Sequence, residues 1–88
     1  MLLSILIPSY NEEGNITELN KKLIESLKNI DYEIIYINDG SKDKTLDKIK
    51  TVSKSNENIK YISFSKNFGK DAAIYAGLKR SNGTDTCI

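Results

Sequence analysis

The sequence predicts an α/β fold with a mostly parallel sheet, and two observations lead to this prediction. First, short apolar runs typical of strands alternate with segments in which apolar residues recur every three or four positions, as in helices. Second, the opening run Leu2–Ile7 is almost continuously apolar, as expected of a strand that is covered on both faces. Together they predict a Rossmann-like three-layer α/β/α arrangement, with about three full strands and the start of a fourth.

Each strand has its own signal in the sequence. The first is Leu2–Ile7, and Pro8 is expected to close it. The second, Tyr32–Ile37, is β-branched and aromatic, and the third, Ile59–Phe64, alternates between apolar and polar residues. Thr84–Ile88 resembles the beginning of a fourth strand.

Three helices are expected to connect these strands. The first opens at Asn15, which is expected to cap its first turn in a capping-box pattern with Glu18. The second runs from about Asp43 to Ser55, and the third covers Lys70–Ser81, before Asn82 and Gly83. By spacing or small size, the residues expected to face the sheet are Ile16, Leu19, Leu23, Ile24, Leu27, Leu46, Ile49, Val52, Ala72, Ala73, Ala76 and Gly77.

Composition excludes several classes of function. Thirteen Lys and Arg against twelve Asp and Glu leave a formal charge of +1, which does not favour nucleic acid or an anionic membrane surface as a partner. The single Cys87, interpreted as a small apolar residue of a terminal strand, and the absence of His exclude an internal disulfide and a Cys/His zinc site. The apolar start lacks a basic leader region and is too short to span a bilayer, so we expect a cytoplasmic chain. The lysines of the second helix are interpreted as a solvated face: Lys44, Lys48, Lys50 and Lys54.

Polar loops rich in turn formers follow the first three strands. They are Pro8–Gly14, Asn38–Asp43 and Ser65–Lys70. In open α/β sheets, ligands bind beyond the carboxyl ends of the strands, because successive loops and helix N-termini converge there. The sequence therefore predicts a binding site at this edge.

Each loop taken alone also has a purely structural interpretation, since Asp39-Gly40 is a common turn dipeptide and Asp43 is a plausible helix cap. The usual glycine-rich phosphate motifs are absent, because no GxGxxG follows the first strand and Gly69-Lys70 lacks the spacing of a phosphate loop. A carboxylate such as Asp39 is suited instead to accept hydrogen bonds from a base imide or a ribose hydroxyl.

Three blocks of the sequence resemble a known family. SILIPSYNEEGNI, EIIYINDGSKDKT and SFSKNFGKDAAIYAGLKRSNGTDTCI are similar, in this order, to the opening blocks of inverting family 2 glycosyltransferases of the GT-A fold. The similarity is to the branch that includes dolichol-phosphate mannosyltransferases and bacterial bactoprenol glucosyltransferases. It covers nearly the whole chain and implies that residues 1–88 are the N-terminal nucleotide-sugar-binding portion of a partial GT-A domain.

The resemblance also implies roles for single residues. Asn67 and Gly69 would shape the third loop, and Asn38 stands where the family more often has the first Asp of a pair, which is expected to alter local polarity or nucleotide preference. Asp39 would contact the base, and Lys70 would flank the base or the diphosphate. The residues implied to bind the nucleotide are Pro8, Ser9, Tyr10, Glu12, Asp39 and Lys70.

For the parent enzyme, the resemblance implies transfer of a hexose from a UDP- or GDP-linked sugar to polyprenyl phosphate or a glycan, at the inner face of the cell membrane. Such a reaction needs Mg²⁺ or Mn²⁺ on an acidic motif and a general base for inversion. Both are expected beyond Ile88, so no catalytic or metal-binding residue is assigned and the 88 residues alone are expected to be inactive.

Two alternatives remain open from the sequence. One is a nucleotide-binding module without transfer chemistry. The other is a structural fragment that self-associates into a homo-oligomer, because a truncated sheet exposes an unpaired edge.

Overall fold

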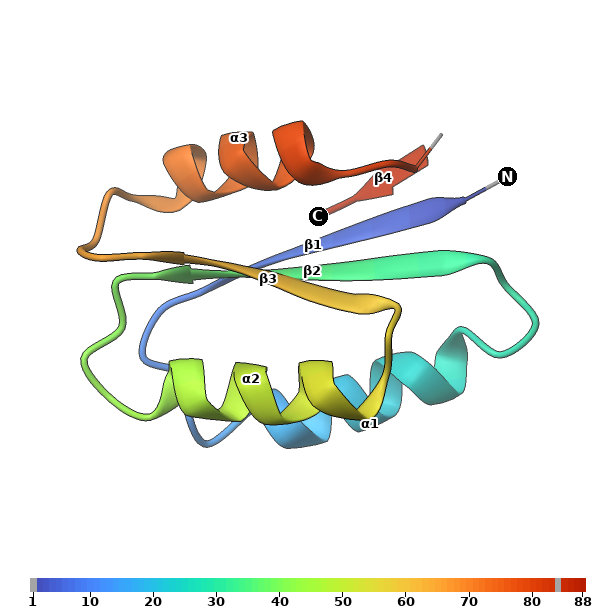
Figure 1. Ribbon diagram of the computed structural model, residues 1–88, viewed down its shortest axis with the longest axis horizontal. Helices are drawn as coiled ribbons and strands as arrows, with labels where there is room; N and C mark the ends of the chain where they lie inside the picture. The colour runs from blue at the N-terminus through green and yellow to red at the C-terminus, as the bar shows by residue number, and fades with distance from the viewer. Residues whose placement is uncertain (1, 84) are drawn as a thin grey trace.

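The computed structural model describes residues 2–83 and 85–88. They form a parallel four-stranded sheet in the order β3-β2-β1-β4, with α1 and α2 on one face and α3 on the other (Figure 1). The three-layer α/β/α prediction is confirmed. The bounds of the elements are β1 (Leu3–Ser9), α1 (Ile16–Ser26), β2 (Tyr32–Asp39), α2 (Thr45–Ser55), β3 (Ile59–Phe64), α3 (Lys70–Arg80) and β4 (Asp85–Cys87).

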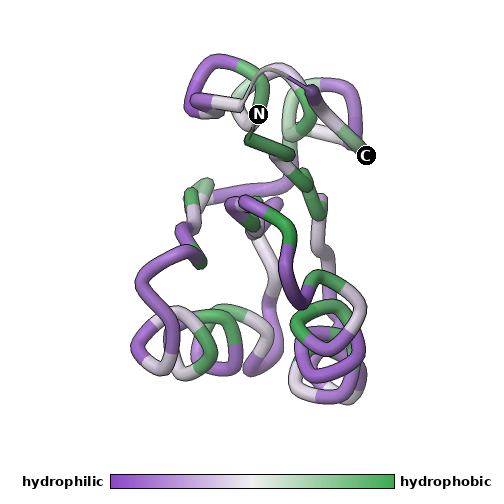
Figure 2. The backbone as a smooth tube through the Cα atoms, turned by 90° about the vertical axis from the view of Figure 1, so that its right-hand side faces the viewer, coloured by the Kyte–Doolittle hydropathy of each residue, from purple (hydrophilic) through white to green (hydrophobic). Residues whose placement is uncertain are grey.

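The handedness of βαβ units explains this layering. The chain moves from β1 to β2 to β3 in one direction across the sheet, then returns through α3 to place β4 on the other side of β1. Because crossovers between parallel strands are right-handed, α1 and α2 share one face and the return through α3 takes the other. Figure 2 shows α3 on one side of the sheet and the other two helices on the opposite side. The direction of winding therefore reverses at β1, and the carboxyl end of β1 is a switch point of the kind at which α/β proteins bind ligands.

The strand β2 is the centre of the core. Its residues 33–39 are all buried, and they alternate between the two faces. Ile34 and Tyr36 belong to the cluster that packs against α1 and α2, whereas Ile35 and Ile37 pack with Ala73 of α3. The near-continuous apolar pattern of this strand thus reflects burial on both faces.

One buried tyrosine needs a polar partner within this core. The hydroxyl of Tyr36 donates a 2.8 Å hydrogen bond to Oδ1 of Asn20 in α1. Burial raises the pKa of Tyr36 to about 12. The pair satisfies both polar groups and ties α1 to the middle of the sheet.

The helix α3 approaches the sheet closely because it presents small residues. Ala73 is fully buried, and a Cβ placed on Gly77 would lie 2.9 Å from Cδ1 of Ile37 and 3.2 Å from the methyl groups of Leu6. Such contacts are tighter than ordinary van der Waals packing. The predicted small-residue face of this helix is confirmed, with Ala72 and Ala76 half-buried beside it.

A buried carboxylate links several segments at the amino-terminal edge of the sheet. Glu33 is 3% exposed, and its Oε2 accepts hydrogen bonds from Oγ of Ser4 (2.5 Å) and the N–H of Asn82 (2.6 Å). Its Oε1 accepts one from Nζ of Lys60 (2.9 Å), and the N–H of Gly83 donates to Oγ of Ser4 (2.9 Å). Burial raises the pKa of Glu33, but the hydrogen bonds from Ser4, Asn82 and Lys60 outweigh it and hold this pKa below its ordinary value.

The structure corrects several sequence-based boundaries of the strands. β1 does not close at Pro8 but runs on to Ser9, because residues 3–9 all pair in one register with β2, with Pro8 opposite Ile37. β2 likewise continues to Asp39. Thr84, predicted to open the fourth strand, lies outside the described residues. Cys87 is in β4 as predicted, but its side chain is exposed.

The helix termini also differ from prediction. Asn15 makes no capping hydrogen bond to α1, and its backbone lies in the αR region rather than in the extended region typical of an N-cap. Its Nδ2 donates to Oε2 of Glu12 (2.8 Å). Glu18 forms an exposed ion pair with Lys22 rather than a capping box. Leu19 was expected on the buried face but is 39% exposed. The second helix begins at Thr45, whose N–H donates to the side chain of Asp43 in the preceding turn, and the third ends at Arg80.

Substituting Glu33 tests the amino-terminal network. Glu33→Gln should lower the free energy of unfolding at pH 7 by about 2 kcal/mol, because the buried N–H and O–H donors lose a charged acceptor. The folded-state pKa of Glu33 lies below the ordinary 4.5, so this contribution is present above pH 4.5 and is lost as the pH falls through the folded-state value. Urea denaturation at pH 7 and pH 3 measures both effects.

The matched control for this substitution is the exposed Glu57. Glu57→Gln should change the free energy of unfolding by less than about 0.5 kcal/mol. Equal stabilities of the two variants at pH 7 would contradict the role given to Glu33.

Candidate functional site

The three polar loops meet at the carboxyl edge of the sheet, as the sequence predicts, and line one cavity of about 760 Å³. The cavity lies at the switch point, beyond the carboxyl end of β1, which has β2 on one side and β4 on the other. It also extends along α1 past Leu19 and Leu23 to Ile88. All six residues proposed from the sequence contribute to its walls: Pro8, Ser9, Tyr10, Glu12, Asp39 and Lys70.

Asp39 ends β2 and is 4% exposed. Its Oδ1 accepts a hydrogen bond from the N–H of Phe68 (2.8 Å), and its Oδ2 accepts bonds from the N–H of Gly69 (3.1 Å) and Nδ2 of Asn67 (3.2 Å). The same Nδ2 also donates to the carbonyl of Asp39 (3.2 Å). This carboxylate therefore holds the loop between β3 and α3 in place, which is a role that the sequence analysis missed.

Gly40 lets the second and third loops touch. Its φ is +69°, in the region that favours glycine, and a Cβ on it would lie 2.2 Å from the backbone carbon of Lys66 and 2.3 Å from the nitrogen of Asn67. The obstacle is backbone, which cannot rotate away as a side chain can. A glycine is thus required both by conformation and by space.

The first loop is joined to the second loop and to the start of α2 by hydrogen bonds between backbone and side chains. The N–H of Glu12 donates to Oγ1 of Thr45 (2.7 Å), and the N–H of Asn11 donates to Oγ of Ser41 (3.0 Å). In return, Oδ1 of Asn11 accepts from the N–H of Lys42 (2.9 Å). The second loop and the start of α2 therefore support the first loop, while Asp39 of the second loop supports the third.

Asn38 uses its amide within the protein. Its Nδ2 donates to Oγ of Ser63 on β3 (3.0 Å), and its Oδ1 accepts from the N–H of Ser41 (3.2 Å). A carboxylate has no N–H donor, so Asn38 makes a pair of bonds that an ionised Asp could not make in this arrangement.

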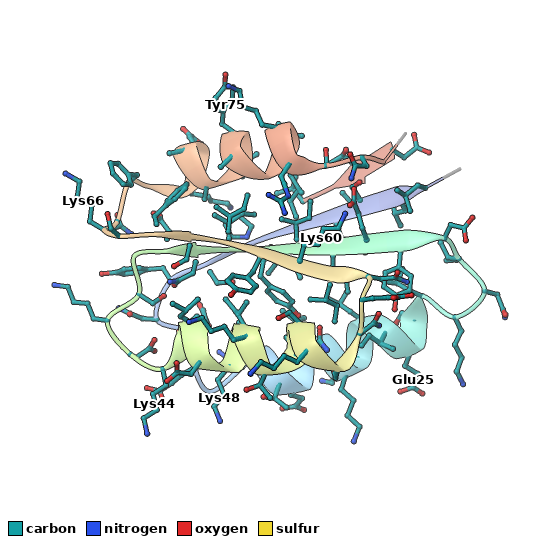
Figure 3. All side chains as sticks on the ribbon, in the orientation of Figure 1. Glu25, Lys44, Lys48, Lys60, Lys66 and Tyr75 are labelled. Carbon is teal, nitrogen blue, oxygen red and sulfur yellow. The ribbon has the colours of Figure 1, made fainter. Side chains whose placement is uncertain are left out.

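Positive charge lies on the third-loop side of the cavity. Lys70 is the first residue of α3 and lines the cavity, where the N-terminus of this helix adds a partial positive charge. Lys66 points away from the sheet (Figure 3), with its Nζ 5.2 Å from the ring centre of Phe68. The lysines of α2 are exposed, and Lys44 and Lys48 extend on the side of the helix away from the sheet, so their prediction as a solvated face is confirmed (Figure 3).

The residues at this edge do not fit a metal centre. In residues 2–83 and 85–88, no group of three or more His, Cys, Asp or Glu side chains is arranged to hold a metal ion. Two carboxylate residues, Glu12 and Asp39, line the cavity, and Asp39 is already bonded to N–H donors. No chemical step is therefore assigned to a metal held by these residues.

None of the helices in the described ranges has the length and apolarity needed to cross a membrane.

Comparison with known proteins identifies the class to which this fold and site belong. Residues 4–88 match the family described as Glycosyl transferase family 2, and the chain therefore belongs to this family. It is 52% identical over 84 residues to the putative glycosyltransferase CsbB of Bacillus subtilis (strain 168), a match that covers 93% of this chain and 26% of that protein. It is 40% identical over 85 residues to the prophage bactoprenol glucosyl transferase homolog of Escherichia coli (strain K12), a match that covers 94% of this chain and 28% of that protein. The chain thus spans about a quarter of the length of the curated relatives that it matches.

Solved structures give the same result for the fold. Residues 1–349 of S. aureus TarS superpose with a TM-score of 0.78 at 29% identity, over 94% of this chain and 25% of that one. The mannosyltransferase PcManGT from Pyrobaculum calidifontis, solved in complex with GDP-Man and Mn²⁺, has a TM-score of 0.78 at 18% identity, over 92% of this chain and 24% of that one. At 18% identity, the similarity to PcManGT concerns the fold alone. The family and the GT-A-type fold inferred from the three sequence blocks are confirmed.

A substitution at Gly40 tests the contact between the second and third loops. Gly40→Ala should lower the free energy of unfolding by about 2 kcal/mol or more, because it adds backbone strain to a steric overlap. Gly14→Ala is the control, since a Cβ on Gly14 meets nothing within 4 Å. Urea denaturation of both variants measures the difference, and equal stabilities would contradict the described packing.

Proposed function

We propose that the cavity binds the nucleoside diphosphate part of a UDP- or GDP-linked sugar. In this proposal, residues 1–88 are the N-terminal nucleotide-sugar-binding portion of a glycosyltransferase that transfers a hexose. The observation that carries it is the convergence of all six proposed residues on one cavity at the switch point of the sheet. Membership of Glycosyl transferase family 2 supports the same proposal.

The walls of the cavity suit the two chemical halves of such a ligand. Tyr10 is 43% exposed, so its ring offers a surface on which a base or ribose can pack. Oδ1 of Asp39 accepts one protein hydrogen bond among the described residues, and a carboxylate oxygen can accept a second from a base imide or ribose hydroxyl. Lys70, at the N-terminus of α3, provides the positive charge that a diphosphate requires. Pro8, Ser9 and Glu12 complete the wall that follows β1.

For the parent enzyme we propose a polyprenyl phosphate or glycan acceptor. The E. coli relative is named a bactoprenol glucosyl transferase homolog, which supports the lipid acceptor, and such an acceptor implies work at the inner face of the cell membrane. The Mg²⁺ or Mn²⁺ of the parent reaction is not assigned to any residue described here. We expect no sugar transfer by the 88 residues alone. Self-association through a sheet edge stays a prediction that light scattering checks.

Nucleotide titration tests the proposed function. Isothermal calorimetry of the 88-residue chain with UDP and with GDP should detect binding of at least one. Lys70→Ala should weaken that binding about tenfold, because a charge-assisted contact to phosphate is lost. Lys48→Ala removes an exposed lysine on the outer side of α2 and should leave the affinity unchanged.

Two results would count against this proposal. One is the absence of heat with both nucleotides under conditions in which the chain is folded. The other is an equal affinity of the Lys70→Ala and Lys48→Ala variants, which would remove Lys70 from the site.

A further inference from the structure

A buried hydroxyl group connects α2 to the first loop of the cavity. Thr45, the first residue of α2, is fully buried and does not line the cavity. Its Oγ1 accepts a 2.7 Å hydrogen bond from the N–H of Glu12 and donates a 2.5 Å bond to Oδ1 of Asp43. Thr45 therefore contacts the cavity wall from behind.

The direction of these bonds is determined by their chemistry. An ionised carboxylate only accepts hydrogen bonds, so the single hydroxyl proton of Thr45 must point to Asp43. The oxygen lone pairs are then left to face the N–H of Glu12. Asp43 is held in turn by the N–H groups of Thr45 (2.9 Å) and Glu13 (3.4 Å). Burial raises the pKa of Asp43, but these hydrogen bonds outweigh it and lower the pKa below its ordinary value, which favours the acceptor form.

Three consecutive N–H groups of the first loop are satisfied in this way. Asn11 donates to Ser41, Glu12 to Thr45 and Glu13 to the carboxylate of Asp43. The Asn11 and Glu13 bonds are exposed, and the Glu13 bond is long at 3.4 Å. The Glu12 bond is the shortest of the three, and its acceptor is fully buried, where competition from water is weakest. Thr45 is therefore the strongest of the three attachments.

We propose that Thr45 is a positioning residue of the cavity. Its hydroxyl, oriented by Asp43, fixes the backbone at Glu12 and with it the Tyr10–Glu12 wall, and so sets the affinity of the cavity for a nucleoside diphosphate. This inference rests on the proposed function of the cavity. It goes beyond that function because it assigns a part in binding to a side chain that does not touch the ligand space.

Three variants of the 88-residue chain test this inference. Thr45→Val keeps the shape of the side chain but removes the hydroxyl, and Thr45→Ser restores a hydroxyl. Thr51→Val is the matched control, because Thr51 is exposed on α2 and its hydroxyl donates only to the carbonyl of Asp47 within the helix. Hydrogen exchange of the Glu12 amide, followed by NMR without nucleotide, and calorimetric titration with UDP and GDP are measured for each.

Thr45→Val should speed exchange of the Glu12 amide about tenfold or more relative to the buried Ile35 amide, because a buried hydrogen bond is lost. It should weaken nucleotide binding about fivefold to tenfold. Thr45→Ser should return both values to within about twofold of the unaltered chain, and Thr51→Val should change neither.

Several outcomes would overturn the inference. Unchanged exchange at Glu12 in Thr45→Val removes the positioning role. An equal rise at Glu12 and Ile35 shows a general loss of stability instead. Faster exchange with an unaltered nucleotide affinity disconnects Thr45 from binding. If the unaltered chain binds neither nucleotide, the proposed function fails, whereas the exchange results still confirm or overturn the hold of Thr45 on Glu12.

Discussion

The architecture depends on β2 holding α3 at both ends through two buried carboxylates. At the carboxyl end, Asp39 accepts the N–H groups of Phe68 and Gly69 immediately before α3. At the amino end, Glu33 accepts the N–H of Asn82 just after it. Between these points, Gly77 lets the helix lie directly on the apolar side chains of the sheet. The crossover that returns the chain to the far side of β1 is thereby attached to the centre of the sheet, and this return creates the switch point at which the cavity lies.

This arrangement gives the two ends of the sheet different functions. The Glu33 carboxylate has its hydrogen bonds within the protein, from Ser4, Lys60 and the segment after α3, and it lies at the edge away from the cavity. The Asp39 carboxylate holds a loop and also borders the cavity, which is why the proposed function gives it a part in ligand binding. Because the loop is already held by Asp39, a ligand meets a wall that is organised before binding, which reduces the entropy lost on association.

The sequence predicted the fold well because its strongest signals come from burial. The apolar run of β2 and the small residues of α3 are direct consequences of packing on both faces of a sheet, and parallel strands must bring their following loops to one edge. What it did not predict depends on contacts between distant segments. Asn15 has the residue type of a cap, but its side-chain amide donates to Glu12, and Pro8 continues β1 because residues 3–9 stay in register with β2. The hydrogen bonds that Asp39 accepts from the third loop depend on the conformation of that loop and on the space left by Gly40, and neither has a local sequence pattern.

The amide at position 38 has a consequence for the charge of the cavity. Asn38 and Asp39 are adjacent and both buried, so a carboxylate at position 38 would add a second negative charge beside the first where water screens poorly. With Asn38, the end of β2 carries one formal negative charge, and Lys70, which directly follows the Gly69 bonded to Asp39, lines the same cavity. Under the proposed function, a ligand with two phosphates would approach this strand end against less repulsion than two adjacent carboxylates would impose, and the Asn38 amide that links β2 to Ser63 of β3 has no carboxyl group to titrate.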